Sequence, residues 1–229
     1  MIKNVLLDLD DTIFDFHYAE AEALRQLFRQ YGRIATDEVT KLYSEINDAY
    51  WKRLERSELT RAEVQTGRFA ELFARVGVDR DPEVANVTYK EIIADIHCYV
   101  AGAEQLLCDL RREGYSVYVV SNGSRSVQTR RLANAGLTNA FDGVFLSEDL
   151  GVEKPSKAFF EVCFSKVPSM KSEETIILGD SLTSDILGGK NAGIKTCWFN
   201  RFGKARRTDI CPDYEISSLD QFIPLIKEQ

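Results

Sequence analysis

The stretch Val5-Leu6-Leu7-Asp8-Leu9-Asp10-Asp11-Thr12 decides how the rest of this chain is interpreted. The part from Val5 to Leu9 is apolar except for Asp8, which predicts a buried parallel strand. Open α/β sheets bind ligands at the C-terminal ends of their strands, where these carboxylates stand. Because side chains alternate along a strand, we expect Asp8 and Asp10 to leave on one side and Asp11 on the other. Two such carboxylates repel each other unless a cation lies between them or one is protonated, which favours a functional site over a polar turn.

Three later apolar runs end in polar residues in the same way. Ser121 follows the first run, Lys154 follows the second across a short loop, and Asp180 and Asp185 follow the third. The runs occupy residues 115–120, 144–146 and 175–178. Since the carboxyl ends of parallel strands meet at one edge of a sheet, we expect these side chains to converge on one site.

These residues form four motifs that resemble those of the haloacid dehalogenase superfamily, in the same order. The motifs are Asp8-x-Asp10-x-Thr12, Ser121-Asn122-Gly123, Lys154-Pro155 and Gly179-Asp180-x4-Asp185. Each motif is weak alone, but four in order, each at the end of an expected strand, are a strong signal. The resemblance extends from residue 5 to about residue 200.

The order of elements predicts an α/β fold with a helical insertion. Helical spacing of apolar residues, with caps, indicates four helices and no strand between residues 15 and 97. Strands and helices then alternate, which implies right-handed crossovers and a parallel sheet. We therefore expect a Rossmann-like catalytic core at residues 1–14 and 98–229 and a four-helix cap domain at 15–97. The resemblance implies a C1-type cap, which closes over the strand ends and contacts substrate.

After the insertion, the expected core consists of helices and strands that follow one another along the chain. Helices are expected at residues 103–113, 125–135, 156–166, 182–192 and 218–227. Strands are expected at residues 115–120, 143–146, 175–178, 194–199 and 214–216, and the last of these has the weakest pattern.

The resemblance implies catalytic roles for two carboxylates. Asp8 would be the nucleophile that attacks phosphorus and forms an aspartyl-phosphate. Asp10 would protonate the leaving alkoxide and then deprotonate the hydrolytic water. Dehalogenases of the superfamily lack a carboxylate at this second position, so Asp10 favours phosphate chemistry over cleavage of a carbon–halogen bond.

The resemblance also implies a Mg²⁺ ion, a hard cation that prefers oxygen ligands. Its ligands would be the Asp8 side chain, the Asp10 backbone carbonyl and Asp180, with Asp185 reaching the metal through water. The alternatives are that Asp180 caps the helix that follows and that Asp185 is a solvated helical residue.

Phosphate oxygens would be bound by Ser121 and the backbone N–H of Asn122, helped by a helix N-terminus. Lys154 would hold the charges of nucleophile and phosphate together. Thr12 would fix the phosphate loop by hydrogen bonding. The alternative for Ser121 is a helix cap.

Composition excludes several other classes of protein. The 229 residues carry a net charge of −7, which argues against a nucleic-acid polymer or an anionic membrane as partner. The five cysteines form no C-x-x-C pair, and the two histidines are far apart. No signal peptide or membrane span is evident, so we expect a cytoplasmic protein, either a monomer or a homodimer. The basic run at 204–207 is interpreted as a solvated loop.

The segments 8–16, 119–123 and 198–201 resemble most the bacterial pyrimidine 5′-nucleotidase branch of the superfamily. The expected function is a Mg²⁺-dependent phosphomonoester hydrolase, with a nucleoside monophosphate as its small-molecule partner. Phe14, Phe16 and Tyr18 could stack on a base or simply pack in the cap. The alternatives are a phosphoglycolate or sugar-phosphate phosphatase, a phosphomutase, and a non-catalytic binding module.

Overall fold

The computed structural model describes residues Met1–Glu228, which form two compact units. The α/β unit comprises Met1–Asp15, Tyr99–Arg125 and the described residues from Ala135 onward. The helical unit comprises Phe16–Cys98 and Ser126–Asn134. The segment Ser126–Asn134, which we expected in the core, makes its contacts within the helical unit. No helix within Met1–Glu228 is long and apolar enough to cross a membrane.

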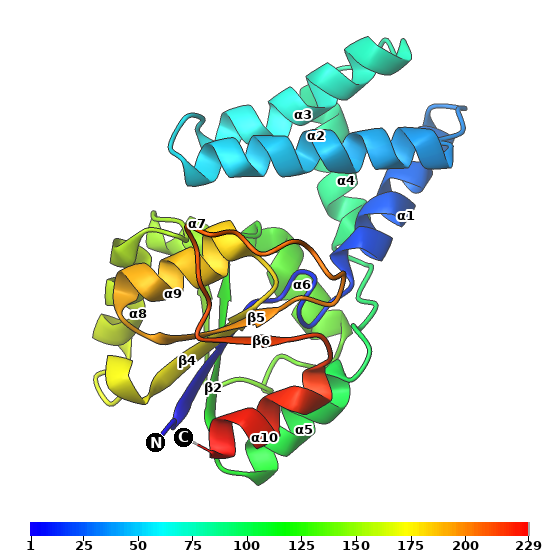
Figure 1. Cartoon of the computed structure of the whole chain (residues 1–229). Coiled ribbons are helices and arrows are strands. Elements are labelled where there is room, and N and C mark those ends of the chain that lie inside the picture. The colour runs from blue at the N-terminus through cyan, green and yellow to red at the C-terminus, as the bar shows by residue number, and fades with distance from the viewer. Residues whose placement is uncertain (229) are drawn as a thin grey trace. The chain divides into compact units, whose positions relative to one another are not determined.

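The α/β unit is built on one six-stranded sheet in which every neighbouring pair is parallel (Figure 1). The strand order is β3-β2-β1-β4-β5-β6. The strands are β1 (Asn4–Leu7), β2 (Ser116–Ser121), β3 (Gly143–Leu146), β4 (Thr175–Gly179), β5 (Lys195–Phe199) and β6 (Tyr214–Ile216). The predicted fold class is therefore confirmed. The strands β2 and β3 lie on one side of β1, and β4, β5 and β6 lie on the other. Ligands of open α/β sheets bind where the strand order reverses in this way, here between β1 and β4.

Helices pack against both faces of the sheet, with α5 beside α10 on one face and α8 beside α9 on the other (Figure 1). Alternate residues of β1 face opposite sides, and Leu6 packs in one cluster with Phe159 and Phe160 of α8. The helices of this unit are α5 (Ala103–Arg112), α7 (Ser147–Leu150), α8 (Lys157–Lys166), α9 (Leu187–Ala192) and α10 (Phe222–Lys227). Helix α6 (Arg125–Asn134) belongs to the helical unit from Ser126 onward.

Two of the predicted helices are interrupted. The helix expected at 182–192 begins with a turn of π-helix, η2 (Leu182–Ile186), before α9. The helix expected at 218–227 begins with a 3-10 turn, η3 (Leu219–Gln221), before α10. Another 3-10 turn, η1 (Ser172–Glu174), and the four-residue α7 were not predicted, because such short elements leave no periodic pattern.

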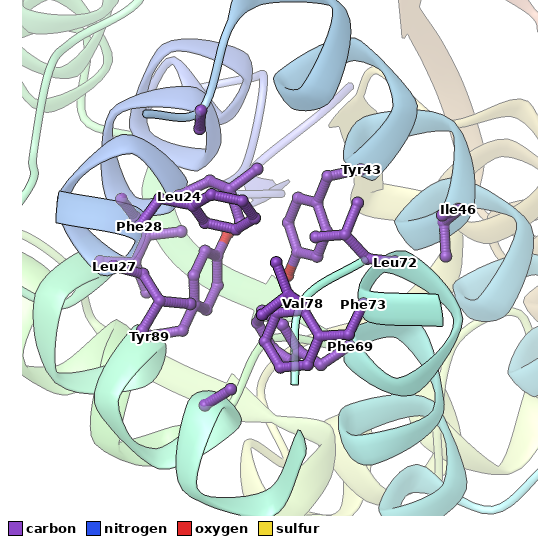
Figure 2. Close-up of a cluster of buried hydrophobic side chains, with 14 of the residues drawn as sticks. Leu24, Leu27, Phe28, Tyr43, Ile46, Phe69, Leu72, Phe73, Val78 and Tyr89 are labelled. Atoms are coloured by element: carbon purple, nitrogen blue, oxygen red, sulfur yellow. The ribbon is translucent and has the colours of Figure 1, made fainter. Parts of the chain in front are cut away.

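Four helices form most of the helical unit, and their ends follow the expected capping rules. They are α1 (Phe16–Gln30), α2 (Asp37–Glu55), α3 (Arg61–Val76) and α4 (Pro82–Ile93). Thr60 and Glu63 form the predicted capping box of α3, and Gly77 ends that helix in the left-handed conformation. Asp81 caps α4 directly before Pro82. Aromatic side chains fill the interior, with Phe69 in contact with both Tyr43 and Tyr89 (Figure 2).

A chain of buried polar side chains also crosses the interior of the helical unit, with one member from each of its four long helices. Asn47 donates to Glu20 (2.8 Å) and accepts from Arg68 (2.7 Å). Arg68 also donates to Asn86 (3.1 Å), and its guanidinium lies 5.3 Å from the ring centre of Tyr89. Among these four hydrogen-bonded side chains, the negative charge of Glu20 balances the positive charge of Arg68.

Candidate active site

Three carboxylates meet at the C-terminal edge of the sheet. Oxygen atoms of Asp8, Asp180 and Asp185 all lie within 4.8 Å of one another. The pairing of β1 with β4 places Leu7 opposite Leu178, so Asp8 follows one strand beside the end of the other. The backbone N–H of Asp8 continues this pairing by donating to Leu178 (3.0 Å). Residues more than 170 positions apart are thus brought to one point, as the sequence motifs led us to expect.

Lys154 inserts its ammonium group into this cluster. Its Nζ donates to Asp8 Oδ1 (2.8 Å), to Asp185 Oδ1 (2.6 Å) and to the carbonyl of Val120 (2.8 Å). The side chain is 1% exposed. Burial alone would lower the pKa of Lys154, but the carboxylates of Asp185 and Asp8 outweigh it and raise the pKa above its ordinary value. Lys154 therefore stays charged and links two of the three carboxylates.

The side chain of Asn122 holds the backbone of Lys154 from both sides. Its Oδ1 accepts from the Lys154 N–H (3.0 Å), and its Nδ2 donates to the Lys154 carbonyl (2.9 Å). Ser121, at the end of β2, is buried, and its hydroxyl accepts from the N–H of Gly123 (3.0 Å). The predicted phosphate-binding loop thus also fixes the lysine, a role of the Asn122 side chain that the sequence motif did not indicate.

The π-helical turn η2 presents Asp185 to the cluster. The N–H groups of Asp185 and Ile186 both donate to the carbonyl of Ser181. Asp185 Oδ2 accepts from the Ser181 N–H (3.1 Å), and its side chain is 1% exposed. A Cβ at Gly179 would lie 2.2 Å from this oxygen, so only glycine leaves room for the carboxylate. The alternative interpretation of Asp185 as a solvated helical residue is therefore wrong.

Asp180 does not act as the helix cap, since the hydroxyl of Ser181 fills that position by accepting from Ser184 (3.1 Å). The carbonyl of Asp180 accepts from the indole of Trp198 (2.8 Å), which is fully buried. Its Oδ2 accepts from Lys204 (3.3 Å). Burial, and after it the nearby Asp11, raises the pKa of Asp180 to about 7, while Lys204 opposes the rise.

The carboxyl group of Asp8 has a raised pKa as well. Burial is the main reason that its pKa lies well above the ordinary value, and Lys154 opposes this rise. The carboxylates of Asp185, Asp10 and Asp180 raise the pKa further. A divalent cation would relieve this repulsion, and a set of carboxylate oxygens is the donor set that Mg²⁺ prefers. The residues present therefore fit such an ion.

Asp10 and Thr12 lie in the turn that follows Asp8. Asp10 is half-buried and pairs by a short bridge with Phe14, and the N–H of Phe14 donates to Leu9 (2.8 Å). The Thr12 hydroxyl is buried and has no hydrogen-bond partner among the described residues. The loop-fixing hydrogen bond expected of Thr12 therefore stays a prediction.

Comparison with known proteins agrees with this arrangement. The family model of the haloacid dehalogenase-like hydrolases matches residues 5–199, a range that includes all four motifs. The chain belongs to the haloacid dehalogenase-like hydrolase family. It is therefore an enzyme of the hydrolase class, as predicted.

Relatives within this family are similar along their whole length. Pyrimidine 5′-nucleotidase PynA of Streptococcus pneumoniae is 36% identical, covering 96% of this chain and 93% of PynA. Pyrimidine 5′-nucleotidase YjjG of Escherichia coli is 30% identical, covering 97% and 96%. The HAD-hydrolase YfnB of Bacillus subtilis is 37% identical, and its magnesium-bound crystal structure superimposes with a TM-score of 0.93 over 98% of both chains.

Two cations near the site were not foreseen from the sequence. Lys204, which we interpreted as part of a solvated loop, contacts Asp180, whereas Arg206 and Arg207 of the same run pair with Glu215 and Asp209. Arg201 binds Asp11 in the turn after β1. Arg201 lies in the segment 198–201 that carries the resemblance, but neither Arg201 nor Lys204 was assigned a role, because each meets its carboxylate only through the tertiary fold.

Proposed function

We propose that this protein is a Mg²⁺-dependent phosphomonoesterase that forms an aspartyl-phosphate and acts on pyrimidine nucleoside monophosphates. The observation that carries the proposal is the cluster of Asp8, Asp180 and Asp185, three buried or half-buried carboxylates with Lys154 inside it. A buried excess of negative charge is costly unless a further cation is bound. Membership of the hydrolase family and the magnesium-bound YfnB structure support the same interpretation.

In the first half of the reaction, a carboxylate oxygen of Asp8 attacks the phosphorus atom of the ester. The P–O bond to the alcohol breaks, and the leaving oxygen takes a proton from the Asp10 carboxyl. Lys154, held by Asp185 and by Asn122, keeps its positive charge beside the attacking carboxylate and the incoming phosphate. The Ser121 hydroxyl and the Asn122 N–H donate to phosphate oxygens.

In the second half, the Asp10 carboxylate takes a proton from water, and the oxygen of that water attacks the phosphorus atom of the aspartyl-phosphate. The acyl phosphate bond breaks, inorganic phosphate leaves and Asp8 returns to its carboxylate form. Asp8, Asp180 and the Asp10 backbone carbonyl would hold Mg²⁺, with Asp185 reaching the ion through water. The bound ion would shield the carboxylate of Asp8 from the anionic phosphate.

The nucleotide substrate is inferred from the relatives PynA and YjjG. Of the three aromatic residues considered for base stacking, Phe14 is fully buried against Tyr99, and Phe16 packs against the core of the helical unit. Tyr18 is 54% exposed, more than either of the other two rings, so it is our candidate for stacking on a base. We propose that the helical unit acts as the cap and that Tyr18 takes part in selecting the substrate.

A phosphate-release panel tests the proposal. Uridine and thymidine 5′-monophosphates, phosphoglycolate and hexose phosphates are compared with Mg²⁺ present and after its removal by EDTA. We expect Mg²⁺-dependent release that is fastest from the pyrimidine nucleotides. Asp8→Asn should abolish it, whereas the exposed Asp209→Asn should not change it. Equal rates on all substrates would overturn the nucleotide assignment. Transfer of the phosphoryl group to a second sugar hydroxyl would indicate a mutase. An active Asp8→Asn variant would overturn the mechanism.

A further inference from the structure

The guanidinium group of Arg201 bridges Asp11 and Asp15, which lie at the start of the turn that follows Asp10 and just beyond its end. One of its terminal nitrogens donates to Asp11 Oδ1 (2.6 Å) and to Asp15 Oδ1 (3.2 Å), and the other donates to Asp15 Oδ2 (3.2 Å). The side chains of Arg201 and Asp11 are only 15% and 8% exposed. The pair with Asp15 is bidentate and the pair with Asp11 is shielded from water, and each of these features makes an ion pair stronger than an exposed single contact.

Arg201 projects from a segment that is itself held firmly. The Asn200 side chain accepts from the Lys204 N–H (2.7 Å), donates to the Lys204 carbonyl (3.0 Å) and donates to Glu215 (2.8 Å). The guanidinium lies 4.3 Å from the ring centre of Phe202. The arginine is thus pre-oriented before it meets its carboxylates, which reduces the entropy lost in forming the contact.

The turn held by Arg201 has an unusual backbone conformation. Asp11 has a φ of 58°, in the left-handed region that few residues other than glycine adopt. Its N–H donates to the carbonyl of Phe14 (2.7 Å), which closes the turn. Such a conformation costs on the order of 1 kcal/mol or more and persists only where the surroundings hold it. The bond from Arg201 to the Asp11 side chain is such a restraint, one residue away from Asp10.

We propose that Arg201 is a positioning residue that orients the Asp10 carboxyl for proton transfer by holding Asp11 and Asp15 together. The inference rests on the proposed function, in which Asp10 protonates the leaving group. Without the guanidinium, the buried carboxylate of Asp11 would lose its ion pair with Arg201, and the turn would relax. Asp10 would then lie out of reach of the leaving oxygen, whereas Asp8 and Asp180, which directly follow β1 and β4, would keep their places.

This role affects only substrates that need a proton on the leaving group. Phenyl phosphate releases a basic phenolate and depends on the general acid, whereas p-nitrophenyl phosphate releases a stable anion and does not. We therefore measure the ratio of kcat/KM for phenyl phosphate to that for p-nitrophenyl phosphate. This ratio does not depend on the fraction of folded enzyme, so a general loss of stability leaves it unchanged.

In Arg201→Gln the ratio should fall about 10- to 100-fold, the usual cost of displacing a general acid. Arg201→Lys should restore it partly, because one ammonium cannot hold two carboxylates in the geometry of a guanidinium. Asp15→Asn, which removes one end of the bridge, should lower the ratio less, and it carries the test if Arg201→Gln does not fold. The exposed Arg207→Gln is the matched control and should leave the ratio unchanged.

A ratio in Arg201→Gln or Asp15→Asn equal to that of the wild type would overturn the inference while leaving the proposed function intact. Absence of Mg²⁺-dependent phosphate release in the wild type would instead overturn the proposed function, and the inference with it.

Discussion

Arg68 in the helical unit and Lys154 in the α/β unit are both buried among polar side chains, and the two arrangements differ in charge balance. In the helical unit, Arg68 is matched by a single carboxylate, Glu20, through the Asn47 amide. In the α/β unit, Lys154 faces three carboxylates of which it binds two, and burial and mutual repulsion raise the pKa of Asp8 and of Asp180. A balanced network stabilises a fold. An unbalanced one stores repulsion that a ligand can relieve, which marks it as a functional site.

Replacing Lys154 and Arg68 by methionine, one at a time, gives the largest expected contrast. Lys154→Met and Arg68→Met should each lower the free energy of unfolding by about 3–5 kcal/mol, because each leaves buried polar partners unpaired. Only Lys154→Met should also lower kcat, by about 10²- to 10³-fold, since it removes charge from the reacting groups. Chemical denaturation in EDTA and phosphate release from phenyl phosphate measure the two quantities. Loss of turnover in folded Arg68→Met as large as in Lys154→Met would contradict the distinction.

The charge excess also predicts how pH affects stability. The pKa of Asp180 is raised to about 7 by burial, so the metal-free folded state holds a proton that the unfolded state has released. The stability that this bound proton gives to the folded state is fully present below the ordinary pKa of an aspartate, about 4. It is lost as the pH rises to about 7. Mg²⁺ requires the ionised carboxylates, so its stabilising effect should be larger at pH 8 than at pH 5.

Thermal unfolding with saturating Mg²⁺ and with EDTA, at both pH values, measures this difference. At 100 times its Kd the ion should stabilise the fold by about 2.7 kcal/mol. If Mg²⁺ raises Tm equally at pH 5 and pH 8, no carboxylate with a raised pKa belongs to the ion site.

The smallest expected effect concerns substrate selection by the helical unit. Tyr18→Ala should raise KM for uridine 5′-monophosphate about fivefold or more, because stacking of a base on an aromatic ring is worth about 1–3 kcal/mol. KM for phenyl phosphate should not change, and Tyr18→Phe should behave like the wild type. If Tyr18→Ala raises both KM values equally, Tyr18 serves the phosphate site or the packing rather than recognition of the base.

The sequence predicted the parts of the fold and site whose signal is local. Apolar runs ending in polar residues located the strands that carry Asp8, Ser121 and Asp180, and capping residues located the helices of the cap. No such pattern marks the residues of the helical unit that would contact substrate. The division into units was less visible, since Ser126–Asn134 lies in the expected core by order but makes its contacts with the helical unit.

The features of the fold and site that the sequence did not predict depend on contacts formed only in the folded protein. Arg201 meets Asp11 across 190 positions, and nothing near either residue indicates the pair. The π-helical turn at Leu182–Ile186 was missed because the same apolar spacing serves an α-helix, although the change of hydrogen bonding turns Asp185 inward. Gly179 is required because Asp185 packs against it, a contact that sequence order alone does not reveal.

Calorimetric titration of Mg²⁺ into the metal-free protein tests most directly whether the carboxylate excess is an ion site. Wild type and the control Asp209→Asn should bind one ion with equal affinity. Asp180→Asn should bind it more than tenfold less tightly, since loss of even an outer partner of a metal ligand costs about 10- to 100-fold. Equal affinity in Asp180→Asn and in the wild type would show that the ion binds elsewhere and would contradict the account.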